Sequence, residues 1–199
     1  MRVDGALDPL PCDGGRWAWD GVVMIWRMSN RADPFCAAIA DRHYNRQKIG
    51  AAQFAPPGRC LVLKADEPEG KAFWITSWPF AQYVKHAWAG AWVCSAFRTE
   101  GLGPASTMIL QAVASTKAYY GTPPQMGIIT FVDTKKVKPT IVKSKPTWGW
   151  TYMKAGFSYV GKTKSGLLAF QMLADKMPDA CNPIDFVEKH KDYACEVNR

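Results

Sequence analysis

The sequence lacks the features of a membrane-spanning or secreted protein. It has no apolar run of about 18 or more residues, the length that a transmembrane helix needs. Its start, Met1–Gly5, lacks the charged-then-apolar pattern of a secretory leader. Its 6 cysteines are widely spaced and form no CxxC pair, which disfavours a disulfide framework or a zinc knuckle. We therefore predict a cytoplasmic protein with reduced thiols and no membrane partner.

Negative charge is absent from one long segment, residues 134–165, which contains no Asp or Glu. Its only charges are eight lysines, equal to the net charge of +8 of the whole chain, so the other residues sum to zero. Charges of one sign repel each other unless an anion binds, and nucleic acid is the anion that such a stretch favours. A solvated lysine-rich loop is the alternative. The eight are Lys135, Lys136, Lys138, Lys143, Lys145, Lys154, Lys162 and Lys164.

The predicted elements alternate as in a single α/β domain, which a chain of 199 residues suits. We expect a mixed central sheet flanked by helices over 21–175, a flexible arm over 1–20, and a tail or short helix over 176–199. Strands are expected at 22–28, 60–65, 72–78, 91–97, 127–132, 157–162 and 166–173, and helices at 33–44, 104–120 and 148–155. The first helix begins at Asp33, an N-cap followed by a proline.

A glycine-containing motif follows the strand expected at 91–97 and opens the next helix. Arg98, Gly101 and Gly103 form the pattern R-x-x-G-x-G, and Ser106 lies in the first helical turn. Glycines there let backbone N–H groups turn toward a phosphate, and the helix N-terminus adds positive charge. The pattern resembles the pyrophosphate loop of GNAT acyltransferases, which transfer acyl groups from coenzyme A. A plain glycine turn is the alternative.

A second element, Tyr152–Phe157, has the spacing Y-x-x-x-G-F. It resembles a GNAT element whose tyrosine lies near the thiol of coenzyme A and acts as a general acid. A phenol suits that role because its ordinary pKa is near that of a thiol. Alternatively, Gly156 only ends a helix and Tyr152 lies in the core. Because both elements occur in the same order as in GNAT proteins, we predict a GNAT-like fold.

Two further side chains are candidates for acid–base chemistry. His43 lies on the same helical face as Phe35 and Ile39, where a histidine is usually a hydrogen-bonded core residue. It also stands beside Tyr44 at the expected helix end, which favours a chemical role. Asp133 follows an apolar strand, at the strand end where catalytic groups gather in α/β sheets. Alternatively, Asp133 is an N-cap or a salt-bridge partner for the lysines after it.

Taken together, the motifs over residues 35–173 resemble the Mom family of bacteriophage DNA-modification proteins. Each motif is short, and the resemblance rests on their common order. The motifs are His43-Tyr44, Pro56–Arg59, Phe97–Gly101, Thr130–Asp133, Tyr152–Phe157, Val160–Thr163 and Gly166–Leu168.

The resemblance implies a DNA-modifying transferase. Mom proteins place a carbamoylmethyl group, also described as acetamido or glycinamide, on the N6 amine of adenine, and the modified phage DNA escapes host restriction. The family's active-site pair corresponds to His43 and Tyr44, its aspartate to Asp133 and its tyrosine to Tyr152. The family has been linked to a bound iron ion, which implies His43 and Asp133 as ligands with Tyr44 as a third.

The chemistry on adenine sets requirements for the site. The N6 lone pair is delocalised into the ring, so a base must accept the N6 proton as the new bond forms. We expect Asp133 in that role, with His43 orienting it or sharing the task. The adenine must also leave the duplex, or the substrate must be single-stranded. Stacking on an aromatic ring offsets the cost, and Trp148 and Trp150 are the candidates. The expected phosphate contacts are Lys135, Lys136, Lys138, Lys143 and Lys145.

The donor of the transferred group is left open by the sequence. GNAT enzymes use coenzyme A thioesters, but the Mom product is joined through a CH₂ carbon, which simple acyl transfer does not give. A glycyl carrier followed by rearrangement, or assistance by a metal, are the alternatives. Arg98, Gly101, Gly103 and Ser106 then hold a phosphate of that donor or are inherited from the fold.

Two rival functions also fit the sequence. An ordinary GNAT acetyltransferase would use acetyl-coenzyme A on a small amine or a protein lysine, without DNA. A non-catalytic DNA-binding protein would bind DNA with a strong salt dependence and form no product. DNA is the expected partner of the Mom-like transferase and of the DNA-binding protein, and both a monomer and a homodimer stay open.

Overall fold

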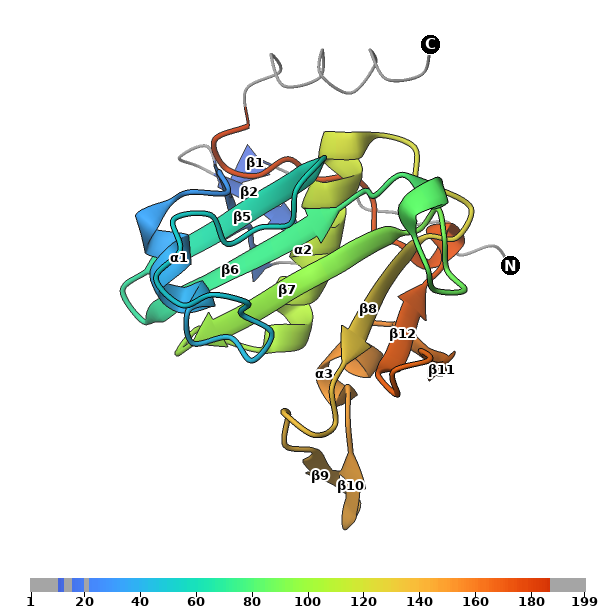
Figure 1. Cartoon of the computed structure of the whole chain (residues 1–199). Helices are drawn as coiled ribbons and strands as arrows, with labels where there is room; N and C mark the ends of the chain where they lie inside the picture. The colour runs from blue at the N-terminus through green and yellow to red at the C-terminus, as the bar shows by residue number, and fades with distance from the viewer. Residues whose placement is uncertain (1–10, 13–15, 20–21, 187–199) are drawn as a thin grey trace, which may run out of the picture.

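The computed structural model describes residues 11–12, 16–19 and 22–186 (Figure 1). A seven-stranded sheet forms the body of the domain, with a three-stranded sheet near the N-terminus and a separate two-stranded hairpin. The strands are β1 Pro11–Cys12, β2 Arg16–Trp19, β3 Val22–Val23, β4 Arg27–Ser29, β5 Cys60–Glu67, β6 Gly70–Ser77, β7 Trp92–Glu100, β8 Ile128–Val132, β9 Thr140–Val142, β10 Lys145–Thr147, β11 Ser158–Lys162 and β12 Leu168–Met172. The α-helices are α1 Pro34–Ala40, α2 Ala105–Tyr120 and α3 Trp150–Lys154, and the 3₁₀ turns are η1 Ala81–Tyr83 and η2 Ala174–Lys176.

The large sheet has the order β11-β12-β8-β7-β6-β5-β4, and its two faces are covered by different helices. Strand alternation explains this, because successive side chains point to opposite faces. On β6, Trp74 belongs to the core cluster that contains Ile109 of α2. Its neighbour Phe73 belongs to the cluster that contains Ile39 of α1. The sheet is therefore buried on both faces between α1 and α2.

One pair of neighbouring strands in this sheet, β7 and β8, runs parallel, and α2 connects them. The two strands pair only at their first residues, ending with Cys94 opposite Thr130. Beyond that point β7 continues along β6 as far as Glu100, whereas β8 continues along β12. The strands consequently diverge toward their carboxyl ends, as Figure 1 shows.

The predicted mixed α/β single domain is confirmed, and most predicted elements are present within a few residues. The cap of the first helix is also confirmed, since the Asp33 carboxylate accepts a hydrogen bond from Phe35 N–H at 2.8 Å. Part of the predicted arm, 11–12 and 16–19, forms strands, and the rest of 1–20 and residues 187–199 lie outside the described residues. No helix among the described residues is long and apolar enough to cross a membrane.

Three predictions of secondary structure were wrong. The strand expected at 22–28 is interrupted between β3 and β4, where Met24 and Trp26 turn into the core instead. The first helix stops at Ala40, because the backbone N–H groups of Arg42 and His43 bond three residues back rather than four. The stretch between the strand expected at 127–132 and the helix expected at 148–155 was expected to be a loop but contains the hairpin of β9 and β10.

Candidate active site

A cavity of about 320 Å³ lies where β7 and β8 diverge, and we call it the cleft. It collects segments that are far apart in the sequence: both strands, the turn after α1, the start of α3 and the base of the hairpin. Its lining residues include His43, Tyr44, Cys94, Ser95, Phe97, Arg98, Thr130, Phe131, Val137, Lys138, Thr140, Thr147, Trp150 and Tyr152.

The Tyr152 phenol lies at the point where the two strands separate. Its oxygen is 3.8 Å from the Cys94 sulfur on β7 and hydrogen-bonds the side chain of Thr130 on β8. Burial raises the pKa of Tyr152 well above its usual value and raises the pKa of Cys94 to about 12. Both groups therefore hold their protons at neutral pH, so Tyr152 carries a proton that it can give to a leaving group more basic than a thiolate, and Cys94 is no thiolate nucleophile.

A glycine fixes the position of the helix that carries Tyr152. Gly149 precedes α3 with a φ of 71°, and a Cβ there would lie 2.2 Å from the ring of Phe170. Only glycine lets the chain pass this close to Phe170. Gly156, with a φ of 89°, ends the same helix as predicted. Tyr152 thus fits both interpretations of its motif, since it packs against the main core and also lines the cleft.

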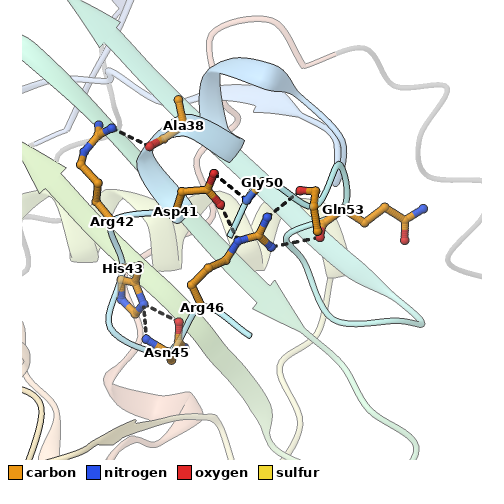
Figure 2. Close-up of polar contacts among 9 residues, drawn as sticks. Ala38, Asp41, Arg42, His43, Asn45, Arg46, Gly50 and Gln53 are labelled. Atoms are coloured by element: carbon orange, nitrogen blue, oxygen red, sulfur yellow. Dashed lines mark hydrogen bonds and ion pairs between the residues drawn. The ribbon is translucent and has the colours of Figure 1, made fainter. Parts of the chain in front are cut away.

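His43 is buried beside the cleft and is held by Asn45 (Figure 2). The Asn45 side-chain N–H donates to the Ser95 carbonyl at 2.8 Å, so the Asn45 oxygen faces the imidazole Nδ1. A hydrogen on Nδ1 satisfies that oxygen. The Phe97 backbone and the Asn45 side chain both favour the charged form of the ring. Burial outweighs these two effects and lowers the pKa of His43, so the imidazole is neutral at pH 7.

The turn after α1, which carries His43, is stabilised by a buried arginine. The Arg46 guanidinium contacts the Asp41 carboxylate at 2.7 Å and donates to the carbonyls of Ala51 and Gln53 (Figure 2). The other Asp41 oxygen accepts a hydrogen bond from Gly50 N–H at 3.0 Å. These bonds satisfy backbone groups that have no partner in a helix or strand, and they fix the approach of the turn to the sheet.

Tyr44 separates the cleft from a second hollow of about 350 Å³ and lines both. Its hydroxyl donates to the Phe131 carbonyl at 3.1 Å, and the backbone of Asp133 also bonds it. Burial is the main reason that the pKa of Tyr44 rises to about 12. Its ring lies 4.5 Å from that of His43, centroid to centroid. Tyr44 is therefore a protonated wall between the two spaces.

Asp133 lies in the second hollow, together with Tyr44 and Lys136, and does not line the cleft. Its side chain accepts a hydrogen bond from Lys135 N–H at 2.9 Å, and its carbonyl accepts from the N–H groups of Lys136 and Val137. Asp133 therefore caps a turn, whereas the alternative interpretation was the N-cap of a helix or a salt bridge with the lysines. The structure thus brings His43, Tyr44 and Tyr152 together around one cavity and leaves Asp133 outside it.

The three expected iron ligands do not fit a common metal site. His43 and Asp133 face different hollows, and the Tyr44 phenol keeps its proton because burial raises its pKa to about 12. A tyrosine binds a metal as the deprotonated phenolate. Among the described residues, no group of three or more His, Cys, Asp and Glu side chains is placed to hold a metal ion.

The glycine motif joins the end of β7 to the start of α2, as predicted. Arg98 lines the cleft, but its guanidinium also donates to Glu100 at 2.7 Å and to the Arg42 carbonyl at 2.9 Å. Gly101 has a φ of 85°, and a Cβ there would lie 2.6 Å from the Glu69 carbonyl oxygen. The local backbone therefore requires glycine at this position, whether or not a phosphate binds. Gly103 and Ser106 do not line the cleft, whereas Ala105, the first residue of α2, does.

The basic segment forms one side of the cleft. Lys138 lines it, and the other four lysines proposed for DNA, Lys135, Lys136, Lys143 and Lys145, are exposed. Trp150 lines the cleft, but Trp148 packs against the core, with its indole N–H donating to the Val137 carbonyl at 2.9 Å. Trp148 therefore anchors the segment rather than offering a free face for stacking.

Sequence reasoning missed the partners that define the cleft. Cys94 was part of a strand predicted only as core, Thr130 stood in the motif Thr130–Asp133 without a role of its own, and Asn45 was not singled out. No model of a known protein family, no curated protein and no solved structure matches this chain significantly. The interpretation of the cleft therefore rests on its own geometry: a protonated phenol, a neutral imidazole and a basic wall around one cavity.

Proposed function

We propose that this protein is a GNAT-like transferase that modifies the N6 amine of adenine in DNA, with the reaction in the cleft between β7 and β8. The observation that carries the proposal is the shared cavity of Tyr152, His43 and Lys138. It combines a proton donor, a proton acceptor and a positively charged wall. The divergence of the parallel strands, and the glycine motif that leads from β7 into α2, support the GNAT-like fold.

His43 is the proton acceptor of this proposal. Its lowered pKa leaves the imidazole neutral, whereas Tyr44 and Cys94 keep their protons because burial raises their pKa values to about 12. Taking up a second ring proton lets the imidazole donate both to Asn45 and to the Phe97 backbone, which compensates part of the cost of charging it. Asp133 has no such role, because it faces the second hollow.

The transfer step divides between two groups. The N6 nitrogen forms a bond to the electrophilic carbon of the donor, and the bond from that carbon to its leaving group breaks. His43 accepts the proton released from N6, and Tyr152 gives its proton to the leaving group. For the carbamoylmethyl product the attacked atom is the CH₂ carbon of the donor. The donor is therefore a compound with a leaving group that accepts a proton from a phenol.

The size of the cleft bears on the form of the substrate. A cavity of about 320 Å³ is at the small end of ligand sites, which span about 300–1,000 Å³. It suits one extruded base with a small donor group rather than a stretch of duplex. Trp150 in the lining offers an aromatic face for the base, which offsets part of the cost of unstacking.

The proposal is tested by the mass of the nucleosides in DNA from bacteria that express the protein. We expect a deoxyadenosine heavier by the transferred group with the wild-type protein, and none with His43→Ala. Asp133→Ala is the matched comparison and retains the product, because its carboxylate lies outside the cleft. Circular dichroism of each purified variant checks that it is folded. Unmodified DNA beside soluble, folded wild-type protein would contradict the proposal, and acetylated lysine or small amines instead would favour an ordinary acetyltransferase.

A further inference from the structure

Among the described residues, the hairpin of β9 and β10 extends farthest from the sheet in Figure 1. Among the described strands these two pair only with each other. The hairpin contributes nothing to the core clusters beyond its base, where Val137 and Trp148 pack. A two-stranded hairpin with so little burial is marginal by itself, so its length calls for a reason outside folding.

The turn of the hairpin has a lysine, Lys143, in a backbone conformation that is unfavourable for residues other than glycine or asparagine. Lys143 and Ser144 have φ values of 48° and 62°. A two-residue turn with both residues in the left-handed region is normally Asn-Gly, because other side chains are strained there. This turn has a lysine instead, and Lys145 follows it directly. The tip is therefore positively charged despite a cost in backbone conformation.

An apolar pair lies between the charged tip and the cleft. Ile141 and Pro146 are directly opposite each other in the hairpin register, so they share one face, and both are exposed. Ile141 is 67% exposed, one of the largest exposures of any apolar side chain in the described residues. Isoleucine and proline are among the side chains that wedge between base pairs in bent or opened DNA.

The base of the hairpin connects this pair to the cleft. Thr140 and Thr147, the next opposite pair, both line the cleft, as does Lys138. Ile141 and Pro146 lie one step of about 3.3 Å beyond this pair and, because successive side chains alternate, on the opposite face of the hairpin. A hairpin held in a groove of DNA by its lysines would thus place the apolar pair against the DNA, one step from the opening that receives the base.

We propose that the hairpin enters a groove of duplex DNA and that Ile141 and Pro146 fill the space left by the adenine that turns out into the cleft. This inference rests on the proposed function and deepens it by naming the element that opens the duplex. A two-stranded ribbon fits the major groove of DNA. Residues 134–165 carry lysines and no acidic side chain, so this segment attracts the negatively charged phosphates.

The test uses purified protein and duplexes in which 2-aminopurine replaces a single adenine, because this base fluoresces when it leaves the stack. No donor is needed. With the wild-type protein we expect a rise in fluorescence, and with Ile141→Ser a rise about tenfold smaller at saturating protein. Ile49→Ser is the matched control, since Ile49 is 74% exposed but lies in the segment between α1 and β5. Its signal stays at the wild-type level.

A shortened hairpin gives a second, independent variant. Because Thr140 and Thr147 are already opposite, Asn-Gly in place of residues 141–146 closes the strands with a favourable turn and leaves the cleft wall intact. We expect this variant to lose the duplex signal as well. Single-stranded DNA with the same probe needs no opening, so Ile141→Ser should bind it with wild-type affinity. The shortened hairpin should bind it more weakly, because it lacks two lysines, Lys143 and Lys145.

Several outcomes overturn the inference. A full wild-type fluorescence signal from Ile141→Ser would show that Ile141 does not open the duplex. A loss of signal from Ile49→Ser as large as that from Ile141→Ser would show that the effect is not specific to the hairpin. Binding of the hairpin to phosphatidylserine vesicles but not to duplexes assigns it to a membrane surface instead. These results are separable from the proposed function, which fails only if nucleoside mass spectrometry finds no modified deoxyadenosine with the wild-type protein.

Discussion

Charged side chains form ion pairs in the body of the domain, around the large sheet, whereas among the described residues those of the basic segment, residues 134–165, do not. In the body, Glu100 accepts both Arg42 at 2.6 Å and Arg98 at 2.7 Å, and Lys64 contacts Asp33 at 2.9 Å. In the segment 134–165 none of the eight lysines forms an ion pair with any other described residue. The first arrangement holds strands and turns together, and the second leaves charge free for an external anion.

This difference separates a region of paired charges from the region that we propose binds DNA. A paired charge on the surface contributes modestly to folding and gains nothing from a ligand. A group of unpaired charges of one sign repels itself in the free protein and gains when a polyanion approaches. The cleft lies at the boundary, with Arg98 from the body and Lys138 from the segment in its lining. The predictions below test this division, beginning with the largest effect.

Removing a core aromatic from the body should cost the protein much of its stability. Trp26 is fully buried, and its indole N–H donates to the Met108 carbonyl of α2 at 2.9 Å. We expect Trp26→Ala to lower the free energy of unfolding by about 3–5 kcal/mol in urea titrations. Tyr83→Ala, at a side chain that is 73% exposed, should change it by about 0.5 kcal/mol or less. Similar losses for both variants would contradict the assignment of the core.

The shortened hairpin should leave that stability nearly unchanged. Because residues 141–146 bury little, their replacement by Asn-Gly should alter the free energy of unfolding by about 1 kcal/mol or less. The same urea titration measures it. A loss as large as that of Trp26→Ala would mean that the hairpin is part of the folding unit and would remove the contrast between the two regions.

Loss of the Tyr152 hydroxyl should slow the proposed reaction without unfolding the protein. We expect Tyr152→Phe to reduce the initial rate of deoxyadenosine modification after induction by about a hundredfold, since a proton donor contributes at least that much. The ring still packs against Phe157, at 5.5 Å between centroids, so urea stability should stay close to wild type. An unchanged rate would exclude Tyr152 as the proton donor.

Charge reversal in the segment should change how DNA binding depends on salt. With Lys135, Lys136 and Lys138 replaced by Glu, the slope of log affinity against log salt concentration should become less negative, by about 0.9 for each phosphate that the protein no longer neutralises. Fluorescence anisotropy with a labelled duplex measures the slope. Lys64→Gln is the control, because Lys64 is paired with Asp33 in the body and should leave the slope as it is. Equal slopes in all three proteins would place the DNA elsewhere.

The smallest effect concerns the pairing of Glu100 in acid. Hydrogen bonding to Arg42 is the main cause that lowers the pKa of Glu100 from its ordinary 4.5 to about 2. A carboxylate with a lowered pKa stabilises the folded state above its unfolded pKa and loses this contribution as the pH falls. The wild type should therefore lose stability relative to Glu100→Gln between pH 4.5 and about 2 in urea titrations. Parallel curves would contradict the pairing.

The strands of the body were predictable because each is an apolar run bounded by turn residues. Their order in the sheet was not, since it depends on which long-range pairs bury the most surface. The hairpin was missed because Lys143-Ser144 lacks the Asn or Gly that signals a tight turn. The helix end before His43 was missed because the apolar spacing of Phe35 and Ile39 continues without a breaker.

The candidate site was predictable in part. The motifs containing His43, Tyr44 and Tyr152 met at one cavity, as the sequence suggested. Asp133 did not line the cleft with them, because it follows β8 in a turn, where its side chain accepts a hydrogen bond from Lys135 N–H. Thr130 and Cys94 could have been identified only from the register that places them opposite each other.

The central claim is that an adenine of DNA reaches the cleft beside Tyr152. The most direct test is a duplex that carries one photoreactive azidoadenine, cross-linked to the protein and mapped by mass spectrometry of the peptides. The account predicts cross-links in the peptide that contains Trp150 and Tyr152, and these should disappear when competing unlabelled duplex is added. Cross-links confined to peptides outside the cleft, such as the one with Phe80 and Tyr83, would contradict it.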